Sequence, residues 1–165
     1  MTELRALLRS ALGTTVFTAL VPGTVVWWAP CFLVVGRERC AAAWPPATTA
    51  AIPFALFVLG VTAYLACAVA FVVHGRGTPA PWDAPRALVA RGLYRFCRNP
   101  MYAGIVLSLL AEARWWREPT MLVYAAVAAV AFHIRVVTYE EPTLRRLFGE
   151  SFASYCARVK RWGVL

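Results

Sequence analysis

Long stretches without charge dominate the hydrophobic pattern of this chain. Residues 10–36 and 40–73 carry no charged side chain, and each stretch exceeds the roughly 20 residues that cross the apolar core of a bilayer. A third stretch covers residues 119–134 and extends to Tyr139 if Arg135 is tolerated. The pattern therefore predicts membrane helices at these three places.

A shorter apolar run covers residues 101–111. It spans a bilayer only if its helix starts near Asn99 and ends among Trp115 and Trp116, since tryptophans favour the interface between lipid and water. We therefore predict an all-α integral membrane protein of about four transmembrane helices, with a tight hairpin between the third and fourth. Pro22 and Gly23 interrupt the first helix and are expected to kink it.

The first apolar run has a second interpretation. Arg5 and Arg9 precede it, as in a cleavable signal peptide. The run is long for a signal peptide, and residues 27–30 contain no convincing small-residue cleavage site. We therefore expect one membrane-embedded domain over residues 1–165, with two N-terminal transmembrane helices in residues 1–75.

The segment after Glu141 predicts an amphipathic helix. Pro142 disfavours helix for the residue before it and suits the first turn of a new one. The apolar residues at helical spacing are Leu144, Leu147, Phe148, Phe152, Tyr155, Val159 and Trp162. The charged residues of the opposite face are Arg145, Arg146, Glu150, Arg158 and Arg161. Such a helix lies at the membrane interface, either as a simple anchor or as a lid over a site.

Composition agrees with a membrane protein, because 61% of the residues are hydrophobic and 15% are charged. The net charge of +9 raises the question of nucleic acid, but its distribution indicates topology instead. Twelve basic residues fall at the two ends and in the central loop, and four fall in the other two loops, partly neutralised by Glu38, Glu112 and Glu118. Both termini are therefore expected in the cytoplasm, with membrane lipid and no nucleic acid as partner. The high alanine and arginine content suggests a bacterial inner membrane.

The five cysteines show neither a CxxC pattern nor the spacing of a metal site. Four of them lie in or beside apolar stretches, where a thiol is usually a small hydrophobic side chain. We predict no disulfide and no zinc. Cys97 lies among polar residues but has no evident base beside it.

The densest polar segment begins at Arg91 and leads into the third helix. Asn99 suits an N-cap and Pro100 the first helical position, which leaves free backbone N–H groups for a carboxylate or phosphate. Arg98 adds a forked donor for the same anion. Gly104 lies on the same helical face as Pro100 and allows a ligand or a neighbouring helix to approach closely. The alternative is a well-capped membrane helix with a basic flank.

Two adjacent carboxylates, Glu140 and Glu141, follow the end of the last apolar run. These carboxylates could be solvated, could pair with arginines such as Arg98, or could hold a cationic ligand or a ribose diol. Upstream, Arg135 should face the bundle interior or extend to the cytoplasmic interface. For His133 an ordinary hydrogen-bonded place in the helix is the better interpretation.

These two motifs together resemble the isoprenylcysteine carboxyl methyltransferases and the related phospholipid methyltransferases, over residues 89–162. The matching positions are Gly92, Tyr94, Arg98, Asn99, Pro100, Tyr102, Gly104, Arg135, Glu140, Glu141, Leu144, Phe148, Gly149, Tyr155 and Val159. The resemblance implies a membrane enzyme that binds S-adenosylmethionine at the cytosolic side and releases S-adenosylhomocysteine. The implied cofactor residues are Gly92, Tyr94, Arg98, Asn99, Pro100, Tyr102, Gly104, Glu140 and Glu141. Asn99 stands where many members have histidine, and Pro142 is a further departure.

Methyl transfer from a sulfonium to an anion neutralises charge, so a dry and apolar site with aligned reactants favours it. Tyr94 and Tyr102 are candidates to hold the sulfonium by cation–π attraction. A small lipophilic or lipid acceptor would enter from the bilayer. Arg135 would orient its carboxylate if it has one, and Glu141 would be the catalytic base if the acceptor is an amine or a hydroxyl. The identity of the acceptor and the oligomeric state stay open.

Two other classes compete with a methyltransferase. A sterol-reductase-like oxidoreductase is distantly similar at the C-terminal end, but those proteins have many more membrane helices. A small transporter or interaction protein is the non-enzymatic alternative. Proton-coupled transporters usually need a carboxylate inside the membrane, and every acidic residue here lies near an expected helix end or loop.

Overall fold

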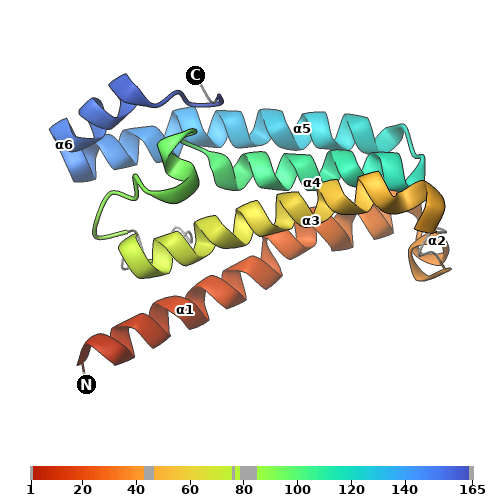
Figure 1. Ribbon diagram of the computed structural model, residues 1–165, viewed down its shortest axis with the longest axis horizontal. Coiled ribbons are helices and arrows are strands. Elements are labelled where there is room, and N and C mark those ends of the chain that lie inside the picture. Colours follow the sequence, from red (N-terminus) through yellow and green to blue (C-terminus); the bar gives the residue numbers. More distant parts are fainter. Residues whose placement is uncertain (1, 43–46, 76, 79–84, 164–165) are drawn as a thin grey trace.

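A computed structural model describes residues 2–42, 47–75, 77–78 and 85–163, and these residues contain helices and no strand. In chain order the elements are α1 (Thr2–Leu20), η1 (Thr24–Trp28), η2 (Pro30–Val35), α2 (Arg37–Ala42), α3 (Ala47–Ala70), η3 (Phe71–Gly75), η4 (Gly92–Arg95), α4 (Pro100–Trp116), α5 (Thr120–Arg135), η5 (Val136–Glu140) and α6 (Glu141–Arg158). The element η4 is a 3₁₀ turn, and the other η elements are π-helical. Helices α3, α4 and α5 run side by side, and α1 diverges from them toward its N-terminus (Figure 1).

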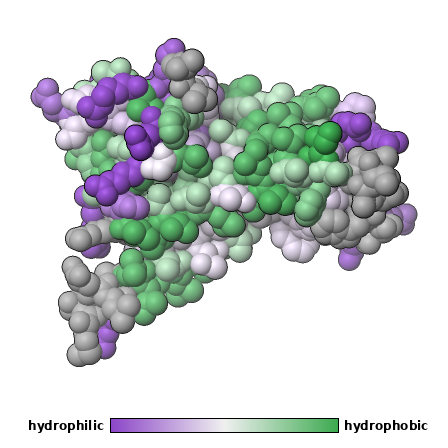
Figure 2. Space-filling view, viewed as in Figure 1, coloured by the Kyte–Doolittle hydropathy of each residue, from purple (hydrophilic) through white to green (hydrophobic). Residues whose placement is uncertain are grey.

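Among the residues that the structure describes, three helical stretches are long and apolar enough to cross a membrane: Leu7–Val35, Ala51–Gly75 and Thr120–Arg158. On the face shown in Figure 2, apolar residues cover the middle of the molecule, and hydrophilic residues gather toward its two ends. The third stretch has 39 residues, more than a bilayer needs, so its charged part beyond Arg135 lies at a polar end. The predicted all-α membrane class is confirmed. The 17-residue helix α4 is not among the three stretches.

Helices α3 and α4 cross in close contact. A Cβ atom built on Gly60 would lie 2.6 Å from the carbonyl oxygen of Gly104 and 2.9 Å from the amide nitrogen of Ser108. The Ser108 hydroxyl donates a hydrogen bond of 3.0 Å to the same Gly104 carbonyl. Leu109 and Met121 are fully buried nearby. Gly104 therefore provides the close approach of a neighbouring helix, which was one of the two uses that its position predicted.

The first apolar run forms a broken helix. Regular α-helix ends at Leu20, just before the predicted interruption at Pro22-Gly23, and the chain continues through η1 and η2. Gly36 ends η2 with φ 91°, a backbone angle that favours glycine, and the chain turns back into α2. This reversal brings Cys31 and Cys40 to a Cα–Cα distance of 5.7 Å, and the two form a disulfide. The prediction that the chain has no disulfide is wrong, because the turn at Gly36 left no mark in the hydrophobic pattern.

Glu112 also differs from its expected place among loop charges. It lies inside α4 with 4% of its surface exposed, and neither carboxylate oxygen has a hydrogen-bond partner among the residues that the structure describes. Arg114 and Arg117, at the end of the same helix, are exposed as expected. The grouping of Glu112 with the loop residues was wrong because helical phase, rather than distance from the helix end, turns its side chain into the bundle.

Beyond the start of α6, the chain as far as residue 163 turns back to the loop that precedes α4 (Figure 1). The backbone of α6 bends at Gly149, whose φ of 48° and ψ of −119° are open to glycine alone. Beyond the bend, Phe152 and Tyr155 are buried and pack near Leu88 and Ala90. This packing places α6 against the polar segment in which the sequence predicted a site.

Candidate functional site

A pocket lies where α4 begins, between the loop before it, η3, η5 and α6. It contains about 1070 Å³ of space when its open mouth is included, and its walls are mostly apolar. The pocket brings together seven of the ten residues predicted as catalytic or cofactor-binding: Tyr94, Arg98, Asn99, Tyr102, Arg135, Glu140 and Glu141.

Glu140 is held from two helices. The Tyr102 hydroxyl donates a hydrogen bond to its carboxylate, and Arg135 Nε donates to Glu140 Oε1 at 3.0 Å and to the Tyr102 oxygen at 3.2 Å. The Tyr102 ring stacks on Phe132 with ring centroids 4.6 Å apart. The guanidinium of Arg135 lies over the ring of Tyr139 at 5.3 Å. This group therefore fixes α4 to the end of α5.

The π-helical turn η5 makes the contact between Arg135 and Glu140 possible. Residues five apart point about 140° away from each other on an α-helix. In a π-helix the backbone hydrogen bonds join residue i to residue i+5, so side chains at this spacing share a face. The single turn Val136–Glu140 thus aligns an arginine and a carboxylate that a regular helix would separate.

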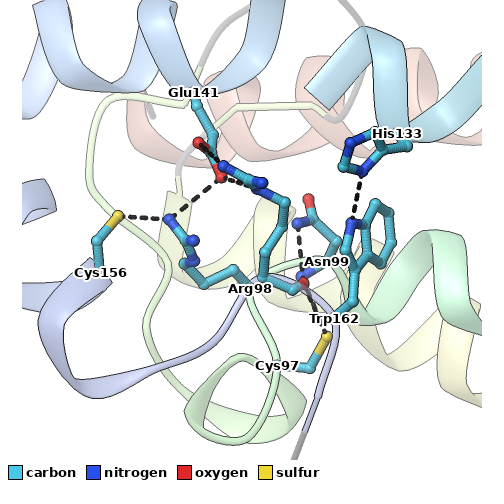
Figure 3. Close-up of polar contacts among 8 residues, drawn as sticks. Cys97, Arg98, Asn99, His133, Glu141, Cys156 and Trp162 are labelled. Carbon is cyan, nitrogen blue, oxygen red and sulfur yellow. Dashed lines mark hydrogen bonds and ion pairs between the residues drawn. The ribbon is translucent and has the colours of Figure 1, made fainter. Parts of the chain in front are cut away.

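Two arginines contact the carboxylate of Glu141, and Figure 3 labels one of them, Arg98. Arg161 Nε and Nη2 donate to its two carboxylate oxygens at 2.7 and 2.9 Å, and Arg98 Nη1 lies 3.2 Å from Glu141 Oε1. The hydrogen bonds from Arg161, with the charge of Arg98, hold the pKa of the Glu141 carboxyl below its usual range. Arg98 Nη1 also donates to Cys156 Sγ at 2.6 Å. Its Nε is buried and has no acceptor among the described residues.

Helix α4 begins where the sequence predicted, but the Asn99 side chain does not cap it. Asn99 occupies the N-cap position and Pro100 the first turn, as predicted. The Asn99 side chain makes no capping hydrogen bond; its Nδ2 instead donates to the carbonyl of Arg161 at 3.1 Å. The Asn99 side chain therefore satisfies none of the backbone donors at this helix end, although the backbone carbonyl of Asn99 accepts from the amide of Ala103 at 3.2 Å.

Three of the implied cofactor residues do not line the pocket. Gly104 packs on α3, Pro100 is buried at the start of α4, and Gly92 is exposed with φ 59° where the chain enters η4. Tyr94 lines the pocket but is deeply buried, with its ring edge-on to Phe71 at 5.8 Å. Gly92 and Gly104 therefore affect the course of the backbone near the pocket and do not form its wall.

Sequence reasoning missed the part played by the last residues of the site. Arg161 was assigned to an exposed basic face and Trp162 to an apolar face. The structure places Arg161 on Glu141, twenty residues earlier, and the indole N–H of Trp162 on His133 Nδ1 at 3.0 Å. No periodic signal marks such contacts, because α6 ends at Arg158 and residues 159–163, which follow it, are not helical. The structure gives His133 the hydrogen-bonded place that was expected for it.

Comparison with known proteins identifies the family. The model of the phospholipid methyltransferase family matches residues 48–151. The chain is also 29% identical over 72 residues to protein-S-isoprenylcysteine O-methyltransferase B of Arabidopsis thaliana, an alignment that covers 44% of this chain and 36% of the relative. The chain thus spans about a third of the length of that relative. No solved structure matches this chain significantly. The resemblance carried by the two sequence motifs is confirmed, and the chain belongs to the phospholipid methyltransferase family.

Proposed function

We propose that this protein is an integral membrane methyltransferase that uses S-adenosylmethionine and methylates a lipophilic acceptor at the cytosolic face. Membership of a methyltransferase family supports the reaction class. The observation that carries the proposal is the composition of the pocket, in which apolar walls meet the Arg135–Glu140 and Arg98–Glu141 groups. A polar cofactor and an apolar acceptor could share such a space.

The residues present fit the proposed cofactor. The buried Arg98 Nε is a donor without an acceptor among the described residues, and a ligand carboxylate would supply one. Glu140 and Glu141 can accept hydrogen bonds from an ammonium group or from ribose hydroxyls. When bound, S-adenosylmethionine supplies an activated methyl group on a sulfonium. We assign its binding to Arg98, Asn99, Tyr102, Glu140 and Glu141, with Tyr94 behind them.

We further propose that the acceptor is a carboxylate. Glu141 was a candidate base, but a carboxyl group whose pKa is held low by two arginines is a weak base for an amine or a hydroxyl. An acceptor that is already an anion needs no base. Arg135 uses Nε for Glu140 and Tyr102, and its terminal nitrogens have no hydrogen-bond partner among the described residues. Arg135 would therefore orient the acceptor carboxylate, and Glu141 would serve binding.

The same proposal includes the orientation in the membrane. We propose four spans, with α4 as the additional one, and both termini in the cytoplasm of a bacterial inner membrane. The pocket then opens on the cytoplasmic side, where most arginines lie. The Cys31–Cys40 disulfide supports this orientation, since it lies at the opposite end of the bundle, where a periplasm would be oxidising.

The first experiment measures cofactor binding. Calorimetry on the detergent-purified protein should give micromolar binding of S-adenosylmethionine and S-adenosylhomocysteine, lost in a Glu140→Ala/Glu141→Ala variant. Glu150→Ala is the matched control, because Glu150 lies on the same helix but is exposed and does not line the pocket. Absence of binding by a folded, monodisperse wild type would refute the proposal.

The second experiment identifies the acceptor. Membranes containing the protein would receive methyl-labelled cofactor with either an S-prenylcysteine derivative or phosphatidylethanolamine. Labelled methanol released by mild base indicates a methyl ester and hence a carboxylate acceptor, whereas base-stable label in the phospholipid indicates an amine. Undiminished ester formation by Arg135→Ala would remove the role given to Arg135.

A further inference from the structure

Residues 159–162, here named the C-terminal strap, cross the start of α4. The strap leaves α6 at Val159, whose backbone is extended. The amide of Arg98 donates to the carbonyl of Lys160 at 2.9 Å. The carbonyl of Arg161 accepts from Asn99 Nδ2 at 3.1 Å and from Cys97 Sγ at 3.4 Å. The backbone of the strap is therefore tied to the polar segment that begins α4.

The side chains of the strap reach two further elements. Arg161 presents the planar fork of its guanidinium to Glu141 in a bidentate pair, and the Glu141 side chain is 15% exposed. Trp162 donates to His133 Nδ1 on α5, which lies beside it in Figure 3. An indole nitrogen can only donate, so His133 Nδ1 must be the acceptor. The strap thus links the start of α4, α5 and the start of α6.

Arg161 controls the surroundings of Arg98. Both guanidinium groups meet at Glu141 Oε1, at 2.7 Å for Arg161 and 3.2 Å for Arg98. If Arg161 were absent, the partners of Arg98 Nη1 would be a Glu141 carboxylate free to rotate and the weak acceptor Cys156 Sγ. The Arg98 Nε that our functional proposal assigns to the cofactor would then lose its fixed direction.

We propose that Arg161 is a positioning residue of the cofactor site: its bidentate pair with Glu141 fixes that carboxylate and, through it, the guanidinium of Arg98. Trp162 holds the strap in place by its hydrogen bond to His133. The inference rests on the proposed function, because it concerns how the same pocket binds its cofactor. Arg161 itself does not line the pocket.

The test compares Arg161→Ala, Arg161→Lys and the matched control Arg158→Ala by calorimetry with S-adenosylhomocysteine on the full-length protein. Arg158 is exposed at the end of α6, and the structure gives it no part in the strap contacts. Loss of charge-assisted hydrogen bonds should weaken binding about 10- to 100-fold in Arg161→Ala. Arg161→Lys keeps the charge but not the fork, so its affinity should fall between those of wild type and Arg161→Ala. Arg158→Ala should bind as wild type does.

A pH series separates positioning from a merely structural role. The charged groups around Glu141 are Arg98 from the loop before α4, Arg161 from the strap and Arg145 from α6. Without Arg161 the pKa of Glu141 should rise toward its ordinary value. The acid limb of the binding curve, which is the pH range over which acid abolishes binding, should therefore move to higher pH. The acid limb of Arg158→Ala should stay in place.

Each outcome decides one of the two proposals. If wild type binds nothing, the proposed function fails. If wild type binds and Arg161→Ala binds equally well with the same acid limb, the role of Arg161 is refuted and the proposed function stands. Should Arg161→Ala not remain folded, Arg161→Lys decides: an intermediate affinity supports the inference, and wild-type affinity with an unchanged acid limb overturns it.

Discussion

The crossing at Gly60 and Gly104 leaves no room for a methyl group, so Gly60→Ala should destabilise the bundle. The added Cβ would clash with Ser108 Oγ, which can rotate away, and would lie 2.6 Å from the Gly104 carbonyl oxygen, which cannot. Restoring an ordinary contact of 3.4 Å would require α3 and α4 to separate by roughly 0.8 Å. Overpacking of this kind costs about 1–3 kcal/mol.

A thermal melt in detergent tests this prediction. Gly60→Ala should lower Tm by several degrees, since about 1 kcal/mol shifts Tm by about 2–4 °C for a chain near this length. Gly23→Ala is the matched control, because its Cβ would lie 3.4 Å from its nearest neighbour and its backbone is helical. Gly60→Ala/Gly104→Ala should lose less than the sum of the single changes, because both act on one contact. A Tm for Gly60→Ala equal to that of Gly23→Ala would refute the reasoning.

Three further predictions concern the disulfide, Glu112 and Glu141. Under denaturing conditions maleimide should label three thiols without reductant and five after reduction, and Cys31→Ser should cost about 2–3 kcal/mol for this short loop; five labelled thiols without reductant would contradict the bond. Glu112→Gln should keep or raise Tm, since it removes a potential charge from a site without hydrogen-bond partners among the described residues, and a fall of several degrees would show that the charge is used. The folded-state pKa of Glu141 is lowered, so its contribution to stability exists above the ordinary carboxyl pKa of about 4.3 and disappears as pH falls through the folded value. Wild type should therefore lose Tm below about pH 4.3 more steeply than Glu141→Gln, and parallel curves would contradict the pairing.

Local signals predicted those parts of the fold that depend on neighbouring residues. Asn99-Pro100 marked the start of α4, and Pro22-Gly23 marked the end of regular helix in the first apolar run. Charge-free length predicted three helices able to cross a membrane. In each case a residue and its immediate neighbours determine the backbone, so no tertiary information was needed.

Other features depend on contacts that the sequence does not encode at a fixed spacing. The Cys31–Cys40 pair required the reversal at Gly36, and the burial of Glu112 required the phase of α4 against its neighbours. The pair of Arg161 with Glu141 joins two segments through a bend and an extended strap. Periodic patterns place residues on faces of regular helices, and they therefore fail where the chain bends or leaves the helix.

The π-helical turn η5 makes this region more sensitive to chain length than to side-chain identity. Its apolar members Val136 and Val137 could be exchanged for similar residues without moving Arg135 relative to Glu140. Removal of one residue would bring Arg135 and Glu140 to the i, i+4 spacing, at which a regular helix also keeps two side chains on one face. Insertion of one residue would instead rotate everything beyond the turn by about 100°. A single-codon insertion in this turn should therefore abolish the pocket while leaving hydropathy and helix content almost unchanged, a loss that neither a hydropathy plot nor circular dichroism would reveal.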